Sequence, residues 1–192
     1  MSIQLIDLFR QAPEPWRNGG GRTRELLRRP AQAGADWALR ISVADIDRDG
    51  DFSAFGGVQR WFVVLEGAGV VLSLPDGEHR LQVGSPPLAF DGAAAPGCRL
   101  LDGPTRDLNL MVQHGRGTLC PVQPGTEWAE PFDARGLFSL SGGLWHPRQG
   151  DAVVVAPFTL LWSDDATPCR FEPVATPDPG LPCGWWIGHA AR

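Results

Sequence analysis

The sequence contains no lysine and no tyrosine, and only four of its 192 residues are histidine. The absence of lysine excludes Schiff-base catalysis and lysine-based phosphate loops, and the absence of tyrosine removes phenol acid–base chemistry. All 17 basic residues are therefore arginines. Any fixed positive charge in a site must come from a planar guanidinium, which binds a carboxylate through two parallel hydrogen bonds.

Long apolar runs, basic clusters and cysteine pairs are also missing. No apolar run approaches the roughly 18 residues of a membrane-spanning helix, so we expect no membrane segment. A formal net charge of -5 without a basic face argues against nucleic-acid binding. The four cysteines show no CxxC spacing, and the N-terminus lacks a signal-type apolar core. We therefore predict reduced thiols and a cytoplasmic protein.

Metal-binding patterns are equally scarce. The histidines stand singly, without HxH or HExxH spacing, so the sequence predicts no metal or other cofactor. The stretch from Asp45 to Gly50 resembles the opening of a calcium loop, but Gly56 occupies the position where that loop needs a bidentate Glu. We interpret this stretch as a solvated acidic turn.

Glycine and proline are abundant, with 24 and 18 residues, and hydrophobic residues reach 43%. Apolar and polar residues alternate along many short segments that end in glycine or proline turns, which is typical of a β-sandwich or barrel. Residues 23–29 fit a helix or a strand equally well. The expected strands are 37–44, 60–65, 70–74, 79–83, 88–90, 108–113, 137–140, 152–156, 158–162, 170–172 and 185–187.

Residues 56–92 look like the hairpin series of a cupin. A metal-binding cupin would carry an HxH pair before this series, a Glu near position 60 and a His in the stretch after Gly92. This chain instead has Ala54, Phe55 and Gly56 in the first place and Arg60 in the second. Replacing an acidic ligand by arginine inverts the local charge, so such an interior would repel a divalent cation and attract an anion.

Several segments together resemble the HutD/Ves family in order and spacing. These are residues 15–21 with 23–25, 40–44, 49–55, 65–67, 101–104 and 106–111. The resemblance implies an all-β bicupin, with two β-barrel or jelly-roll modules in one chain and without the usual cupin metal ligands. We expect an N-terminal module over 1–117 and a more degenerate module over 118–192, with strands that are exchanged between them in some arrangements.

An anion pocket is the site that these residues favour. Arg40 and Ser42 share one face of a strand, while Arg60 and Asn109 lie on strands that a cupin would place nearby. The predicted ligand-binding residues are Trp16, Asn18, Arg40, Ser42, Phe52, Arg60 and Asn109. Other roles stay open: Arg40 in an ion pair with Glu25 or Asp107, Asn18 as the cap of a glycine turn, and Trp16 and Phe52 as core residues.

The resemblance implies a non-catalytic protein that binds a small anionic metabolite, such as N-formylglutamate, and regulates histidine utilisation or a related stress response. One alternative is an enzyme that uses arginine and a carboxylate, such as an amide or formyl hydrolase or an isomerase. Another is an interaction module, for example a homodimer, in which exposed Trp185 and Trp186 become buried on assembly.

Overall fold

β-strands make up nearly all of the regular structure in the computed structural model, which describes residues 2–30, 37–175 and 178–191. The helical segments among these residues are two short 3-10 turns, η1 (Leu8–Arg10) and η2 (Gly92–Ala94). The segment that fitted a helix or a strand lies within strand β3 (Gly21–Arg29). The predicted all-β class is confirmed. No helix in the described part of the chain is long and apolar enough to cross a membrane.

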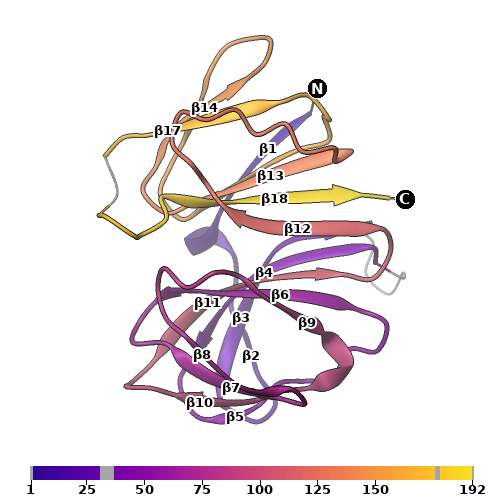
Figure 1. Cartoon of the computed structure of the whole chain (residues 1–192), viewed down its shortest axis with the longest axis vertical. Coiled ribbons are helices and arrows are strands. Elements are labelled where there is room, and N and C mark those ends of the chain that lie inside the picture. The colour runs from indigo at the N-terminus through magenta and orange to yellow at the C-terminus, as the bar shows by residue number, and fades with distance from the viewer. Residues whose placement is uncertain (1, 31–36, 176–177, 192) are drawn as a thin grey trace. The chain divides into compact units, whose positions relative to one another are not determined.

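The chain divides into two compact units whose limits differ from the expected ones. One unit is Gln11–His114, and the other joins Met1–Arg10 to Gly115–Arg192. The N-terminal strand β1 (Ile3–Asp7) explains the difference, because it pairs with β16 (Thr159–Ser163) over its whole length. Figure 1 shows this indigo strand running beside the orange and yellow strands of the second unit.

The unit Gln11–His114 consists of two antiparallel sheets. The six-stranded sheet has the order β2-β3-β4-β11-β6-β9, and the four-stranded sheet has the order β5-β10-β7-β8. The strands of the first sheet besides β3 are β2 (Glu14–Pro15), β4 (Leu39–Ile46), β11 (Thr105–Val112), β6 (Gln59–Glu66) and β9 (Leu88–Asp91). Those of the second are β5 (Gly50–Asp51), β10 (Gly97–Leu100), β7 (Val70–Leu74) and β8 (Gly77–Leu81).

The core of this unit lies between its two sheets. Phe62 and Val64 of β6 pack with Leu72 of β7 and Leu81 of β8. Because side chains on a strand alternate between faces, Arg60 points to the same side as Phe62. The inner face of the six-stranded sheet is therefore apolar over part of β6 and carries a charged guanidinium at the start of that strand.

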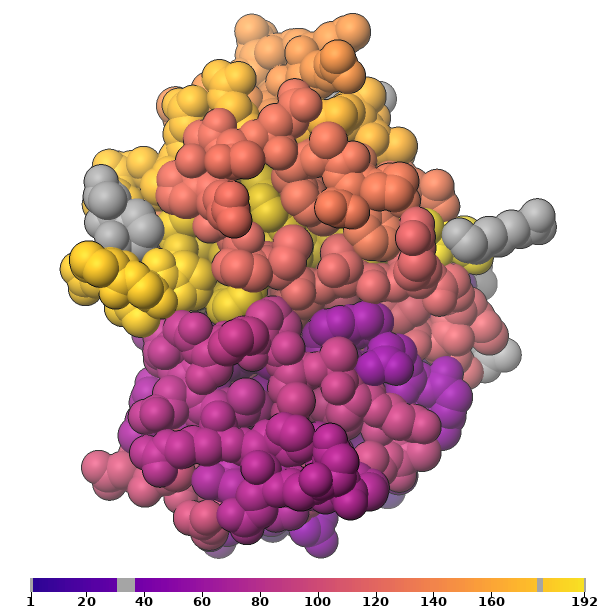
Figure 2. Space-filling view, viewed as in Figure 1, coloured from indigo at the N-terminus to yellow at the C-terminus, as the bar shows by residue number. Residues whose placement is uncertain are grey.

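The second unit also has two sheets. The five-stranded sheet has the order β1-β16-β13-β18-β12, and the three-stranded sheet has the order β15-β14-β17. The additional strands are β12 (Arg116–Pro121), β13 (Ala134–Ser139), β14 (Gly143–Pro147), β15 (Val153–Val155), β17 (Cys169–Pro173) and β18 (Gly184–Ala190). Figure 2 draws the atoms of both units in the same view as Figure 1.

Aromatic side chains fill the interior of this second unit. Trp128, Trp145, Phe171 and Trp186 all belong to its core, and the rings of Trp128 and Trp186 stack with centroids 5.1 Å apart. The expectation that Trp185 and Trp186 are exposed is wrong, since they are only 1% and 3% exposed. Neighbouring residues of a strand point to opposite faces, and both faces of β18 are covered within the chain.

Candidate functional site

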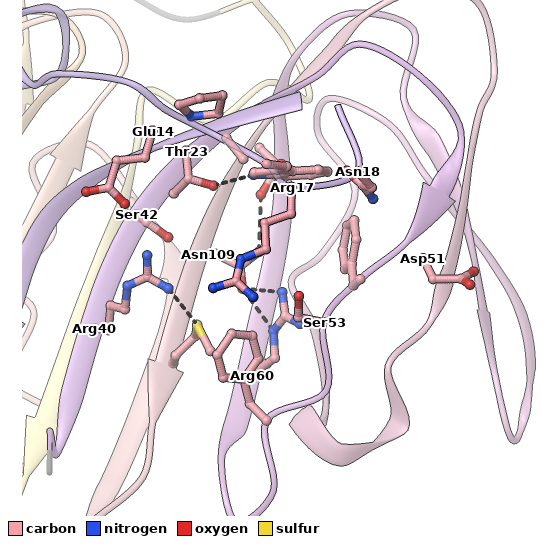
Figure 3. A pocket seen from close by; sticks show the side chains of 17 residues that line it. Glu14, Arg17, Asn18, Thr23, Arg40, Ser42, Asp51, Ser53, Arg60 and Asn109 are labelled. Atoms are coloured by element: carbon pink, nitrogen blue, oxygen red, sulfur yellow. Dashed lines mark hydrogen bonds between the residues drawn. The ribbon is translucent and has the colours of Figure 1, made fainter. Parts of the chain in front are cut away.

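A cavity of about 460 Å³ lies within the unit Gln11–His114. Every residue predicted to bind the ligand lines it, on strands β4, β6 and β11 and on the segments around β2 and β5 (Figure 3). The full lining is Glu14, Pro15, Trp16, Arg17, Asn18, Thr23, Arg40, Ser42, Ala44, Asp51, Phe52, Ser53, Phe55, Arg60, Asp107, Asn109 and Met111. The alternation along three neighbouring strands brings these distant parts of the sequence together.

The register of the sheet explains how the polar residues meet. Asn109 of β11 lies opposite Ser42 of β4 on one side and opposite Phe62 of β6 on the other. Met111 of the same strand lies opposite Arg40 and Arg60 in the same way. Since residues directly across a sheet point to the same face, Arg40 and Arg60 both reach the cavity from either side of β11.

Arg60 forms the floor of the cavity and is only 5% exposed. Its Cζ lies 5.3 Å from the ring centroid of Phe52, 5.7 Å from that of Phe55 and 5.0 Å from that of Phe90. Its Nε and Nη2 donate hydrogen bonds of 3.2 and 3.0 Å to Oδ1 of Asn109. Burial lowers the pKa of Arg60 to about 10, so the guanidinium is still charged at neutral pH.

Asp107 lies on the same face of β11, two residues before Asn109, and is 1% exposed. Nδ2 of Asn109 donates a hydrogen bond of 3.2 Å to Oδ1 of Asp107, so the amide links the carboxyl group to the guanidinium of Arg60. Burial raises the pKa of Asp107 to about 7, although the Asn109 hydrogen bond and the charge of Arg60 both oppose the rise.

One polar atom on each of these charged groups has no partner. Nη1 of Arg60 and Oδ2 of Asp107 are buried without a hydrogen bond to any described residue. An unsatisfied buried donor or acceptor costs about 1–3 kcal/mol, more when it is charged, and such atoms are rare in native proteins. Two residues that line the cavity, Arg60 and Asp107, therefore each hold a buried polar atom with unused hydrogen-bonding capacity.

Arg40 lines the wall of the cavity and takes the ion pair that the sequence left open. Its Nε donates to Oε2 of Glu25 at 2.8 Å, and Nη2 of Arg28 donates to the same oxygen at 2.6 Å. Its Nη1 lies 3.9 Å from Sδ of Met111. Arg40 is thus held toward the cavity, with its charge partly balanced by Glu25.

The hairpin between β2 and β3 forms part of the mouth. The backbone N–H of Trp16 donates to the carbonyl of Gly21 at 2.9 Å, and the indole Nε1 donates to Oγ1 of Thr23 at 2.7 Å. Oδ1 of Asn18 accepts from the backbone N–H of Gly20 at 2.9 Å. Asn18 therefore caps the glycine turn as well as lining the cavity.

The glycines of this turn allow a positive φ and a close approach of two backbone segments, as their sequence context indicates. Gly19 has a φ of +67°, which side chains other than glycine rarely adopt. A Cβ on Gly21 would lie 2.3 Å from the carbonyl oxygen of Asp45 on β4. These residues allow the mouth segment to approach the sheet closely.

Several lining residues were not among those predicted from the sequence. Asp107 and Met111 alternate with Asn109 on β11, so the period-2 pattern that placed Asn109 could have placed both of them. Arg17 stands between two predicted residues and is exposed at the mouth. Glu14 and Asp51 carry no such signal, because their strands are only two residues long.

Asp45 departs from the sequence interpretation. It was expected in a solvated turn, but it is buried in β4, while Asp47 and Asp49 are exposed. Its Oδ2 accepts from Arg22 at 2.9 Å and from Arg24 at 2.7 Å, and its Oδ1 accepts from Arg106 at 2.6 Å. These guanidinium groups hold the pKa of Asp45 at about 2, against the effect of its burial.

The cavity does not fit a divalent metal ion. Cupin metal sites rest on histidine and acidic ligands, whereas no histidine lines this cavity and its inner carboxyl group lies beside the Arg60 guanidinium. The described residues also contain no group of three His, Cys, Asp or Glu side chains that are placed to hold a metal ion.

The second unit has a buried arginine of its own, and both of its Nη atoms are hydrogen-bonded, whereas its Nε has no partner among the described residues. Arg135 is 3% exposed, and its Cζ lies 4.9 Å from the ring of Trp128. Its Nη atoms donate to the backbone carbonyls of Trp128, Glu130 and Ala166 at 3.4, 2.5 and 2.7 Å. Arg135 thus binds backbone carbonyls on both sides of its strand, and it is not among the residues that line the cavity of the second unit.

Comparison with known proteins finds HutD and Ves proteins among the relatives of this chain. The HutD family model matches residues 10–145. An uncharacterized 21.2 kDa protein in the hutC 3' region of Pseudomonas putida is 39% identical over 109 residues, 57% of each chain, so the match spans less than two thirds of that relative. Protein Ves of Citrobacter koseri is 31% identical over 165 residues, which are 84% of each chain.

Solved structures show the same fold over the whole chain. HutD from Pseudomonas fluorescens SBW25, in a formate condition, has a TM-score of 0.83 at 26% identity, with full coverage of both chains. Oxalate decarboxylase OxdC of Bacillus subtilis has a TM-score of 0.65 at 9% identity and shares the fold alone. The predicted cupin-like jelly-roll fold is therefore confirmed, and the family model together with the Ves match shows that this chain belongs to the HutD family.

Proposed function

We propose that this chain is a binding protein for a small carboxylate, with its site in the cavity above Arg60. The observation that carries the proposal is the guanidinium of Arg60, a lining residue that is buried and charged and whose Nη1 has no hydrogen-bond partner among the described residues. A carboxylate oxygen is the natural acceptor for such a donor, because charge-assisted hydrogen bonds contribute about 1.5–3 kcal/mol each.

The rest of the lining suits a short ligand with a second polar end. Ser42 and Thr23 offer hydroxyl groups, Arg40 offers a second guanidinium, and Phe52 provides an apolar wall. N-formylglutamate has this chemistry, and the relatives named HutD or encoded in the hutC region support a ligand from histidine utilisation. A small ligand with few heavy atoms is expected to bind with a Kd of about a micromolar to a millimolar.

In this account binding serves regulation: the chain senses a small anionic metabolite of histidine utilisation, or of a related stress response, and limits the pathway. The experiment that tests the proposal is a thermal-shift screen of the whole chain with N-formylglutamate, urocanate, glutamate and formate. Binding to the folded state alone raises Tm with ligand concentration. If none of these carboxylates raises Tm at millimolar concentration, the proposal is wrong.

Asp107 favours a second candidate, an enzyme that acts on an amide or formyl group. Its carboxyl group lines the cavity beside Arg60, and its pKa of about 7 is suitable for general acid–base catalysis at neutral pH. Such an enzyme would release formate and glutamate from N-formylglutamate, and Asp107→Asn would abolish the release. Unchanged N-formylglutamate after prolonged incubation with the wild-type chain would leave the binding protein as the function.

A further inference from the structure

The charges on the cavity floor come as a closely linked pair. Asn109 accepts hydrogen bonds from Arg60 and donates one to Asp107, so the two charged groups share one amide. When Asp107 is ionised, its charge cancels that of Arg60 inside a low-dielectric site. When Asp107 is protonated, the floor carries one uncompensated positive charge.

Among the described residues, no other charged group that lines the cavity neutralises the charge of Arg60 in the way that ionised Asp107 does. Arg40 faces the cavity from β4, but it shares Glu25 with Arg28. Asp51, Glu14 and Arg17 lie at the exposed mouth, where water screens them.

The groups that act on Asp107 from the surrounding strands are few. Arg60 on β6 lowers its pKa, and Asp45 on β4 raises it. Burial and the charge of Asp107 both raise the pKa of the Cys98 thiol on β10, so Cys98 is uncharged at neutral pH. No arginine donates a hydrogen bond to Asp107 among the described residues, and its Oδ2 is left unpaired.

We propose that Asp107 takes up a proton when a small carboxylate binds at Arg60, so that the cavity binds its anion together with a proton. The inference rests on the proposed function, and it assigns to that site a residue that couples affinity to pH. A bound anion beside an ionised Asp107 would place two like charges in a buried site, which is strongly unfavourable. Protonation removes the repulsion and also turns Oδ2 into a donor for the second carboxylate oxygen.

The pH range in which ligand binding takes up a proton follows from the pKa of Asp107 in the unliganded protein. The pKa of Asp107 is already raised to about 7 by burial, and an anion next to it raises the value further. Below that pH the group is neutral before and after binding, so affinity is constant. Above it, binding takes up about one proton, and the Kd rises about tenfold for each pH unit.

The experiment is a calorimetric titration of the whole chain with N-formylglutamate and, separately, with formate. Titrations at the same pH in two buffers whose ionisation enthalpies differ, Tris and Hepes at about pH 8 and Bis-tris and Mes at about pH 6, give the number of protons taken up per ligand. We expect about one proton at roughly pH 8 and about none at roughly pH 6. This measurement needs no variant, so it stands even if a substitution impairs folding.

The variant Asp107→Asn mimics the protonated state at every pH. It should bind with a Kd that does not change between about pH 6 and pH 8, and at about pH 8 it should bind roughly tenfold more tightly than the wild type. Asp102→Asn, outside the cavity, is the matched control and should keep the wild-type pH dependence. Binding without proton uptake, or an unchanged pH profile in Asp107→Asn, overturns the inference alone, whereas no binding at any pH overturns the proposed function as well.

Discussion

Arg60 and Asp45 show two ways in which a single side chain departs from the ordinary rule that charge stays in water. Arg60 is enclosed by the rings of Phe52, Phe55 and Phe90 and keeps an unpaired donor atom, whereas both carboxylate oxygens of Asp45 accept hydrogen bonds from arginines. Arg60 can therefore still donate a hydrogen bond to a ligand, whereas the acceptors of Asp45 are already used within the protein. Asp45 therefore stabilises the six-stranded sheet and does not bind the ligand.

Substitution of Asp45 should lower stability in a pH-dependent way. The folded-state pKa of about 2 lies below the unfolded value, so ionised Asp45 stabilises the chain above about pH 4, and this contribution is lost as pH falls toward 2. Asp45→Asn should lower the free energy of unfolding by roughly 2 kcal/mol at neutral pH. Urea unfolding at about pH 7 and pH 3 measures the difference, which should be smaller at the lower pH; an equal loss at both would contradict the assignment.

Substitution of Asp107 should have the opposite effect in the unliganded protein. Its folded pKa of about 7 lies above the unfolded value, so the wild type loses stability as pH rises from about 4 to 7. Asp107→Asn removes this dependence and should be more stable than the wild type at about pH 8, by an amount on the order of a few kcal/mol. Urea unfolding across this range checks the prediction, and a variant less stable than the wild type at pH 8 would contradict it.

The site could be located from the sequence to the extent that strand alternation governs it. Arg40, Ser42 and Asn109 follow directly from the period-2 pattern and line the cavity as placed. Glu25 of β3 lies opposite Ser42, two residues from Arg40, whereas Asp107 of β11 lies opposite Ala44, four residues away, so strand register decides which carboxylate pairs with Arg40. A single-residue shift of register moves every later side chain to the other face, and the sequence pattern does not reveal it.

At the scale of the strand, segments in which apolar and polar residues alternate clearly were predicted as strands, whereas segments interrupted by glycine or proline were not. Strand β7 has the expected limits, and β6 extends the expected segment by one residue at each end. Strands β12 and β14 were not predicted, because they contain Gly117, Pro121, Gly143 and Pro147, which usually mark turns. Their backbone pairing is set by neighbouring strands of the sheet.

The turn between β6 and β7 offers a test of an element's geometry. Gly69 has a φ of +103°, and a Cβ there would lie 2.1 Å from the carbonyl oxygen of Leu81. Gly69→Ala should therefore lower the free energy of unfolding by about 2 kcal/mol or more, because both the backbone and the contact are strained. Thermal unfolding measures the loss.

Gly56→Ala is the matched control for this turn, since a Cβ at Gly56 would meet nothing within 4 Å. Its stability should stay within about 0.5 kcal/mol of the wild type. Equal losses for the two variants would show that the turn geometry described here is not what limits substitution.

At the scale of the whole chain, the family resemblance predicted the fold, and β1 joins the unit that contains the C-terminal half. No strand was predicted near the N-terminus, and an alternating pattern would not say which sheet such a strand joins. Strand β1 pairs with β16, far away in the sequence, at the edge of the five-stranded sheet. The N-terminal residues therefore belong to the unit that contains the C-terminal half.

Deletion of residues 2–10 tests this assignment. The deletion exposes the edge of β16, so backbone amides around Leu160 and Leu161 should lose protection from hydrogen exchange. Amides of β4 in the unit Gln11–His114 should keep theirs, and exchange followed by mass spectrometry reports both. Loss of protection in β4 with an unaltered β16 would contradict the placement of β1.

The central claim is that the Arg60 guanidinium holds a carboxylate, and a calorimetric titration with N-formylglutamate tests it most directly. The wild type should bind with a Kd of about a micromolar to a millimolar, and Arg60→Gln should bind at least about tenfold more weakly. Arg99 is exposed on β10, outside the cavity, and Arg99→Gln should bind the ligand as the wild type does. Equal affinity of the wild type and Arg60→Gln, or no binding by either, would contradict the account.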